Sequence, residues 1–501
     1  MHTAPEQHEV TEPPRPAGPR HRAAIVFVIT ALGSFMASLD LSIVNIAFPA
    51  IKTSYPQASQ ASLAWIITAY SIVFGALLVT GGRTGDRLGR KRTFLIGTAV
   101  FIAGSFLCGI APDVPVLVAS RVLQGVGAAF LVPSSVGLLI GAYPPSRRTQ
   151  MISLWGGIGA LAVATGPSLG AALVTAGGWR WVFFVNVPVG LAILVVGRRI
   201  LVESERSRSD ARPDYLGVIL VSLAVAALVA AVSEGSGWGW SDPRIIAAFV
   251  AAVVLTFAFL YRSGHHPQPV IDLTLFSDRS FAAANAATLV YAAGFFAILL
   301  GNILFLTEVW HYSIMRAGLA VTPGPLVVAA VAGPAGKVAA RIGFRPVIMA
   351  GGTLMAAGLA WYVLRVGTTP SYLAEWLPGT LIVGLGIGLS FPVLSAAAVS
   401  SLNPGRFAIG SAVNQTARQV GGALGIAILV LLTSKPAGLT GALDHFDHVW
   451  IFGAITSFSA GLIGLLIPRT SAKARARTKA LEPELVDADA GLPLAPPELD
   501  S

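Results

Sequence analysis

The sequence predicts an all-α integral membrane protein with fourteen transmembrane helices. Only 12% of the 501 residues are charged and 54% are hydrophobic, whereas a soluble chain has about 25% charged residues. Fourteen apolar runs each have the roughly 17–25 residues that a helix needs to cross a bilayer. These runs do not alternate polar and apolar residues, as the strands of a membrane barrel do, so the spans are expected to be helices.

The expected spans follow one another between two polar tails. The tails, 1–22 and 469–501, are rich in Pro and in charged residues, and we expect both to be disordered and cytoplasmic. The basic start of the second tail suits contact with anionic membrane lipids. The fourteen runs are 23–49, 60–81, 93–110, 115–140, 150–174, 181–200, 215–233, 244–262, 284–307, 317–336, 346–365, 377–400, 408–432 and 449–467.

A degenerate internal repeat divides these spans into two sets. Two glycines and one arginine of the segment 82–90 recur in register in the segment 336–345. The match pairs the second span with the tenth and predicts two six-helix bundles, 23–202 and 284–468. An inserted helix pair at 203–262 and a cytoplasmic linker at 263–283 then lie between them. Parallel halves with a binding site between them near the midplane are a known transporter architecture.

The basic residues predict the orientation of the chain. Six of the 34 Lys and Arg residues lie in loops opposite the termini and two lie inside spans, which leaves 26 on the side of the termini. Because cytoplasmic loops carry the excess of Lys and Arg, we expect both termini in the cytoplasm. The bias also accounts for most of the net charge of +10, so we expect no nucleic-acid partner.

Several function classes lack their sequence signatures. The single cysteine, Cys108, lies in an apolar run and cannot form a disulfide framework or a Cys-based metal site. The sequence has no phosphate-binding loop, no hydrolase nucleophile motif and no Cys/His cluster. We therefore expect no enzyme activity, no cofactor, no metal and no ATP-driven pumping.

Asp40 is the residue on which the functional prediction depends, because it is an acid inside the first span. A carboxylate there costs about 2.5–3.5 kcal/mol on insertion scales and usually has a charged partner or a water cavity beside it. Arg121 in the fourth span lies at a similar depth, since both are about 9–14 Å below the outer edge at ~1.5 Å per residue. Protonation of Asp40 would break such a pair, which makes the two residues a candidate proton-coupling site. The alternative is a static structural ion pair.

Polar side chains in other spans are candidates for contact with a substrate. Asn414, Gln415 and Arg418 lie in the thirteenth span, with Arg418 near the midplane and Glu308 too shallow to pair with it directly. We expect Arg418 to face the central cavity, a partner from the first half, or an anionic or phenolic substrate group. The alternative is snorkelling or carbonyl contact. Asn45 either lines the cavity near the acid or makes an interhelical hydrogen bond.

Two further motifs suggest moving parts. The segment after the second span places an acid among basic residues. The basic residues alone would make an orientation anchor, and because that role needs no acid, we expect the segment to be a cytoplasmic latch as well. Its candidate residues are Gly82, Asp86, Arg87, Gly89 and Arg90. In the fifth span, small residues allow close helix approach and a proline permits a bend. The residues of this candidate rocking interface are Gly157, Gly166, Pro167 and Gly170.

Taken in order, these motifs resemble those of the major facilitator superfamily, and in particular its fourteen-helix drug:proton antiporters, over 23–467. The stretch 39–49 is similar to the first-helix signature and 121–127 to the fourth-helix signature, which the family implies takes part in proton transfer. The segment 82–92 resembles the superfamily loop signature, 157–170 the exporter signature, and 179–190 is typical of the fourteen-helix branch. The departures are small: Thr84 and Gly85 in the loop, and Ala171 after the exporter signature.

The resemblance implies proton-coupled efflux of amphipathic drugs or antibiotics across the cytoplasmic membrane by alternating access. Its partners would be a small amphipathic substrate, protons and membrane lipids, with the chain acting as a monomer. Within transport, the alternative is a dedicated exporter of one natural product or lipid-like metabolite. A different class is a membrane sensor or scaffold that transports nothing.

Overall fold

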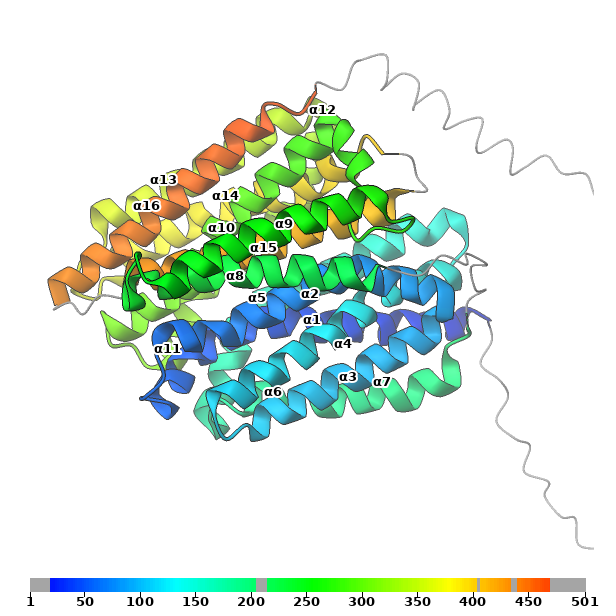
Figure 1. Ribbon diagram of the computed structural model, residues 1–501, viewed down its shortest axis with the longest axis horizontal. Coiled ribbons are helices and arrows are strands. Elements are labelled where there is room, and N and C mark those ends of the chain that lie inside the picture. Colours follow the sequence, from blue (N-terminus) through cyan, green and yellow to red (C-terminus); the bar gives the residue numbers. More distant parts are fainter. Residues whose placement is uncertain (1–18, 204–213, 403–405, 434–438, 469–501) are drawn as a thin grey trace, which may run out of the picture.

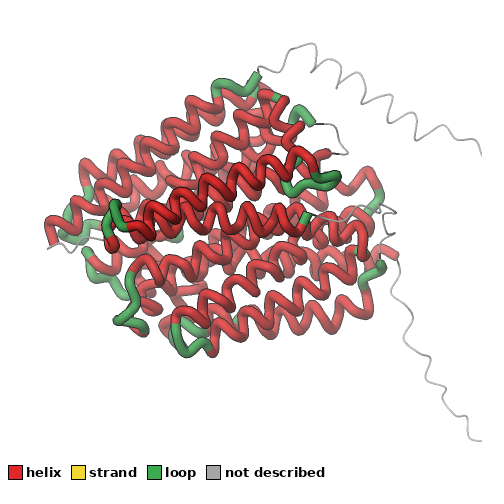
Figure 2. The backbone as a smooth tube through the Cα atoms, in the orientation of Figure 1, coloured by secondary structure: helices red, strands yellow, loops and turns green. Residues whose placement is uncertain are grey.

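Within residues 19–203, 214–402, 406–433 and 439–468, which the computed structural model describes, the chain is a bundle of helices without strands (Figures 1 and 2). Fourteen helical segments are long and apolar enough to cross a membrane. These findings confirm the predicted fold class. The predicted tails lie outside the described residues except for 19–22, which are already helical.

The first six spans are built from seven helices. The sixth span is divided at Val185 between two of them. The elements are α1 (Pro19–Ser54), α2 (Gln60–Leu88), α3 (Arg90–Ile110), α4 (Val114–Ala142), α5 (Pro145–Gly177), α6 (Trp181–Phe184) and α7 (Asn186–Ile200).

The inserted pair and the second half follow. A 3-10 turn precedes the second half, and its second and fourth spans each contain two elements. The elements are α8 (Tyr215–Trp238), α9 (Pro243–His265), η1 (Leu273–Ser277), α10 (Arg279–Glu308), α11 (Ile314–Val321), α12 (Pro323–Ile342), α13 (Phe344–Arg365), η2 (Tyr372–Trp376), α14 (Leu377–Val399), α15 (Phe407–Thr433) and α16 (Leu439–Gly464).

Capping residues and glycines set several helix ends and explain where the predicted limits are wrong. The Asp278 side chain accepts from the N–H of Phe281, so α10 begins five residues before the predicted 284. Helix α2 continues past the predicted 81 to Leu88, because no residue breaks it before Gly89. Gly89 has φ +103° and its counterpart in the repeat, Gly343, has φ +97°, a backbone conformation that favours glycine.

The two halves are separate bundles that meet along α5 with α11 and α12 and along α2 with α15. Helices α1 to α7 pack mainly on one another, as do α10 to α16, and α2 runs against α15 between them. Helix α8 covers the seam between α2 and α15 and contacts both helices, while α9 packs on α8 (Figure 1). Below we call the end of the bundle where α1 begins and α16 ends the terminal face, and the other end the opposite face.

Candidate functional site

A buried ion pair lies inside the first bundle. Arg121 of α4 donates from Nη1 to Oδ2 of Asp40 on α1 at 2.5 Å, and the two side chains are 1% and 0% exposed. Because an unpaired charge at this depth is costly, the pair explains how both residues are tolerated in apolar helices. The structure thus brings together the two residues that the sequence paired.

Gln124, one turn beyond Arg121 on α4, completes the shell of this pair. Its Oε1 accepts from Arg121 Nη1 at 2.6 Å, and its Nε2 donates to Asp40 Oδ1 at 2.8 Å. The same Nε2 lies 3.1 Å from Ser105 Oγ of α3, which also accepts from Asn186 of α7 at 3.0 Å. Both carboxylate oxygens of the acid are therefore hydrogen-bonded, and four elements of the first half, α1, α3, α4 and α7, meet at one network.

The remaining contacts of Arg121 come from α2. Its Nε donates to the backbone carbonyl of Ile66 at 2.8 Å, and its guanidinium lies 4.2 Å from the ring centroid of Tyr70. An aromatic face stabilises a desolvated guanidinium by ~2 kcal/mol. In this conformation the guanidinium is held by an acid, an amide, a carbonyl and a ring, and Asp40 is sealed within the first half.

Asn45 and Asn414 are buried in helix packing. The Asn45 amide donates to the carbonyl of Leu41 on its own helix at 2.9 Å and is fully buried. Asn414 Nδ2 donates to Thr288 Oγ1 at 2.9 Å and to Asn285 Oδ1 at 3.2 Å, which ties α15 to α10.

Arg418 lies on a different side of α15. Successive residues of a helix are rotated by ~100°, so the contacts of neighbouring residues show which way each side of α15 faces. Thr416 donates to the carbonyl of Gly75 at 2.6 Å and lies on the side facing α2, whereas Asn414 lies on the side facing α10. Ala423 packs with residues of α2 and α8. The flank turned away from α8 carries Gln415 and Arg418, both partly exposed. The Arg418 guanidinium lies 4.1 Å from the ring centroid of Phe391 on α14.

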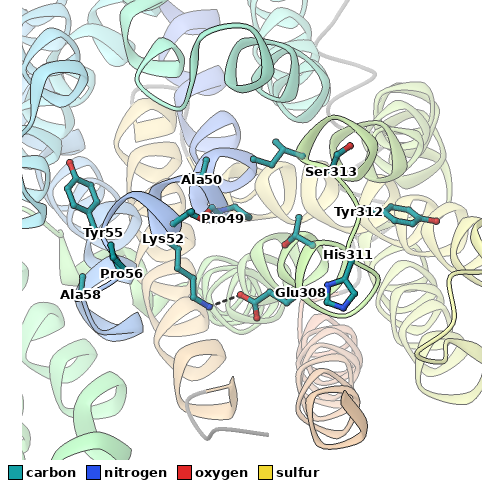
Figure 3. A pocket seen from close by; sticks show the side chains of 13 residues that line it. Pro49, Ala50, Lys52, Tyr55, Pro56, Ala58, Glu308, His311, Tyr312 and Ser313 are labelled. Atoms are coloured by element: carbon teal, nitrogen blue, oxygen red, sulfur yellow. Dashed lines mark hydrogen bonds and ion pairs between the residues drawn. The ribbon is translucent and has the colours of Figure 1, made fainter. Parts of the chain in front are cut away.

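An ion pair joins the two halves at the opposite face. Lys52 Nζ, near the end of α1, lies 2.7 Å from Glu308 Oε1 at the end of α10. The pair crosses a pocket of about 730 Å³ whose walls are the ends of these helices and the segment 311–314 (Figure 3). Glu308 therefore pairs with the first half and not with Arg418. Gln60 of α2 donates to Thr433 of α15 at 2.9 Å at the same end.

The glycines of α5 fall into a packed group and an open group. A Cβ on Gly166 would lie 1.9 Å from Ser42 Oγ of α1, so any larger residue there would displace the Ser42 side chain. A Cβ on Gly318 of α11 would lie 2.7 Å from the carbonyl of Pro167. Toward the terminal face, Gly157 is exposed and a Cβ there would meet nothing within 4 Å. Helix α5 thus packs closely on the second half near the opposite face, where Gly318 meets it.

Gly170 belongs to the packed group, since a Cβ there would lie 2.4 Å from Ile46 of α1. On α12, Gly333 and Gly336 resemble Gly157, because both are exposed with nothing within 4 Å of an added Cβ. Glycines near the terminal face of α5 and α12 are therefore exposed, whereas toward the opposite face α5 packs against α11.

The predicted latch segment forms a local ion pair. Asp86 Oδ1 lies 2.9 Å from Arg90 Nη2, and Arg90 Nη1 donates to the carbonyl of Gly137 on α4 at 3.0 Å. The segment is not a loop: Gly82, Asp86 and Arg87 lie in the end of α2, Gly89 caps it, and Arg90 begins α3. A Cβ on Gly89 would meet the carboxylate of Glu203, which accepts from the N–H groups at the start of α3.

Sequence reasoning missed several members of the buried network. Gln124 stands three residues after Arg121 and shares its helix face, so its position could have indicated it. Ser105, Tyr70 and Asn186 are neutral residues in three other helices, and no spacing in the sequence connects them to the acid. The Lys52–Glu308 contact spans 256 residues and depends on how the two bundles dock.

The model of the Major Facilitator Superfamily matches residues 30–426. The chain belongs to this superfamily. Three relatives cover most of its length: the "Multidrug resistance protein B homolog" of Mycobacterium tuberculosis is 33% identical over 81% of the chain and 75% of the relative. The "Tetracenomycin C resistance and export protein" of Streptomyces glaucescens is 34% identical over 87% and 79%. The "Methylenomycin A resistance protein" of Bacillus subtilis is 31% identical over 86% and 90%.

Solved structures of two superfamily members share the fold. A bacterial homologue of the human drug peptide transporters PepT1 and PepT2 aligns with a TM-score of 0.60 at 16% identity, over 93% of this chain and 99% of that one. The xylose transporter XylE of E. coli, in a partially occluded inward open conformation, aligns at 0.59 and 14% identity over 88% and 98%. The family match and the curated relatives make the chain a membrane transporter and not an enzyme.

Proposed function

We propose that this transporter exports amphipathic small molecules across the cytoplasmic membrane in exchange for protons. The observation that carries the proposal is the sealed network of Asp40, Arg121 and Gln124. A proton added to Asp40 removes its charge and leaves Arg121 buried without a counter-ion, which costs several kcal/mol. That free energy favours a different packing of α1 against α4, so a proton can change which conformation is stable.

The transport cycle follows from where the halves touch. The excess of Lys and Arg on the side of the termini supports a cytoplasmic terminal face. With that orientation, the Lys52–Glu308 pair closes the external side, and the exposed glycines near the terminal face of α5 and α12 support an inward-facing state. Outward opening would rock the bundles 23–202 and 284–468 apart at α11, where Gly318 contacts α5.

Protons and substrate would then move in opposite directions. In the outward-facing state Asp40 takes a proton from outside, and the substrate leaves. In the inward-facing state Asp40 releases the proton to the cytoplasm and re-forms the ion pair with Arg121. The names of the relatives, which refer to multidrug resistance and to resistance against tetracenomycin C and methylenomycin A, support a drug-like substrate.

The test is a susceptibility screen in a bacterial host that lacks its own efflux pumps. Wild-type protein should raise the tolerated concentration of several amphipathic antibiotics, and a protonophore should abolish this protection. Asp40→Asn should give none, whereas Asp447→Asn, which removes a partly exposed carboxylate from α16, should protect like wild type. Protection by Asp40→Asn equal to wild type would refute the proton-carrier role, and protection against a single compound would indicate a dedicated exporter.

A further inference from the structure

Arg418 is a cation inside a span for which the described residues supply no counter-ion. It lies eleven residues into α15, about 16 Å from the start of the helix at ~1.5 Å per residue. Among the described residues no carboxylate lies within ion-pair distance of Arg418, and no hydrogen bond holds its guanidinium. A charge at such depth requires water or an anion beside it, and the side chain is partly exposed.

An aromatic wall fixes the guanidinium in place. Phe391 lies beneath it, and the rings of Tyr291 and Phe295 approach Phe391 edge-on, with centroids 5.2 and 5.1 Å away. Tyr291 and Phe391 are buried, whereas Phe295 is partly exposed. Stacking of this kind orients the planar fork of an arginine, and the fork matches a carboxylate in two parallel hydrogen bonds.

The acids that could have paired with Arg418 are already paired with other residues. Asp40 is paired with Arg121 inside the first half, and Glu308 is paired with Lys52 at the opposite face. Among the nearby polar residues of α15, Asn414 bonds to α10 and Thr416 to the carbonyl of Gly75, and the neutral amide of Gln419 is buried without a hydrogen-bond partner in the described part of the chain. The interior flank of α15 therefore presents one unmatched positive charge next to exposed aromatic surface.

We propose that Arg418 and the Phe391–Phe295 wall form the recognition site for aromatic substrates that carry a carboxylate or phenolate anion. The proposal rests on the proposed export function and specifies its substrate class. An anion of this kind places its charged group on the free edge of the guanidinium and its ring against Phe295. A cationic aromatic compound meets a like charge in a place of low dielectric constant and is disfavoured.

Equilibrium binding to the purified full-length protein tests this assignment without any proton gradient. The probes are three fluorescent compounds of similar shape: anthracenecarboxylate, its methyl ester and an anthracenylmethyl-trimethylammonium cation. At about pH 7 the carboxylate is ionised, so the three differ in charge at one position. Wild-type protein should bind the carboxylate most tightly and the cation most weakly. Tighter binding of the cation than of the carboxylate would overturn the proposal.

Substitutions then test whether Arg418 and Phe391 produce the preference for the carboxylate. Arg418→Gln should weaken carboxylate binding roughly 10- to 100-fold, the usual effect of losing a hydrogen-bonded charge, and leave the ester nearly unchanged. Arg418→Lys should keep part of the preference, because it keeps the charge without the planar fork. Phe391→Leu should weaken both the carboxylate and the ester. An unchanged ratio of carboxylate to ester affinity in Arg418→Gln would overturn the assignment, and ester binding shows that the variant is folded.

The binding experiment and the test of proton-coupled export can fail independently of each other. Asp40→Asn should retain the wild-type ratio of carboxylate to ester affinity, because the acid lies in the first half and does not contact Arg418. A protein that prefers the carboxylate through Arg418 but moves no protons would support the recognition site and refute proton coupling. The reverse result would refute the recognition site alone.

Discussion

Reversing one charge of the Lys52–Glu308 pair should shift the transporter toward a state that is open at the opposite face. The side chains are 42% and 41% exposed, so the pair contributes only about 0–1 kcal/mol to the closed state. Lys52→Glu replaces this attraction with a repulsion of similar size. The total change is then up to about 2 kcal/mol, which is about 30-fold in the ratio of open to closed molecules.

Spin labels on either side of the pocket measure this ratio. Gln57 and Ser313 are exposed and lie on the first and second halves, so each accepts a label after conversion to Cys; Cys108 is fully buried. Pulsed electron spin resonance should show a larger share of long distances in Lys52→Glu than in wild type. High salt should reduce the difference, because exposed pairs are screened.

Two controls decide whether the pair itself is responsible. The double reversal, Lys52→Glu with Glu308→Lys, should restore the wild-type distances. Arg244→Glu reverses a charge paired with Asp242 two residues away, at the same face but within the inserted segment, and should leave the distances unchanged. If the double reversal stays as open as the single one, or Arg244→Glu opens the protein equally, the pair does not hold the face closed.

Three further predictions concern packing. Gln124→Leu should lower the free energy of unfolding by about 1–3 kcal/mol, because it leaves a buried carboxylate oxygen of Asp40 without its donor; unchanged thermal unfolding would contradict the network. Gly318→Leu should separate α11 from α5 and increase labelling of a cysteine introduced at Ser313, whereas Gly157→Ala, in open space, should not; equal labelling of both variants would contradict the close contact. Asp214→Asn should lower thermal stability, because it weakens the buried 2.5 Å ion pair that joins the start of α8 to Arg262 of α9; a wild-type melting curve would contradict this.

Much of the fold follows from the sequence because a bilayer constrains it strongly. A span must satisfy its own backbone hydrogen bonds, so long apolar runs can only be helices or closed barrels. The breaks inside spans were not predicted: Val185 divides the sixth span, and the tenth contains α11 and α12. Such breaks depend on packing against neighbouring helices, which hydropathy does not report.

The candidate site was predictable only where a charge stood out against an apolar background. Asp40 and Arg121 could be paired from their depths alone. In the same way, the sequence showed that no acid of the second half lies at the depth of Arg418. The expectation for Asn45 was less specific, and its amide bonds to its own helix. Neutral partners such as Ser105 carry no such signal, because serine is common in membrane helices and its hydroxyl can bond to the preceding turn.

Proton release on substrate binding is the measurement that tests the central claim most directly. Purified wild-type protein in weakly buffered detergent solution, at a pH where Asp40 is protonated in part of the molecules, should release protons when it binds a compound identified in the susceptibility screen. Asp40→Asn should bind the same compound and release none, while Asp447→Asn should behave as wild type. Equal proton release from Asp40→Asn and wild type would contradict the account.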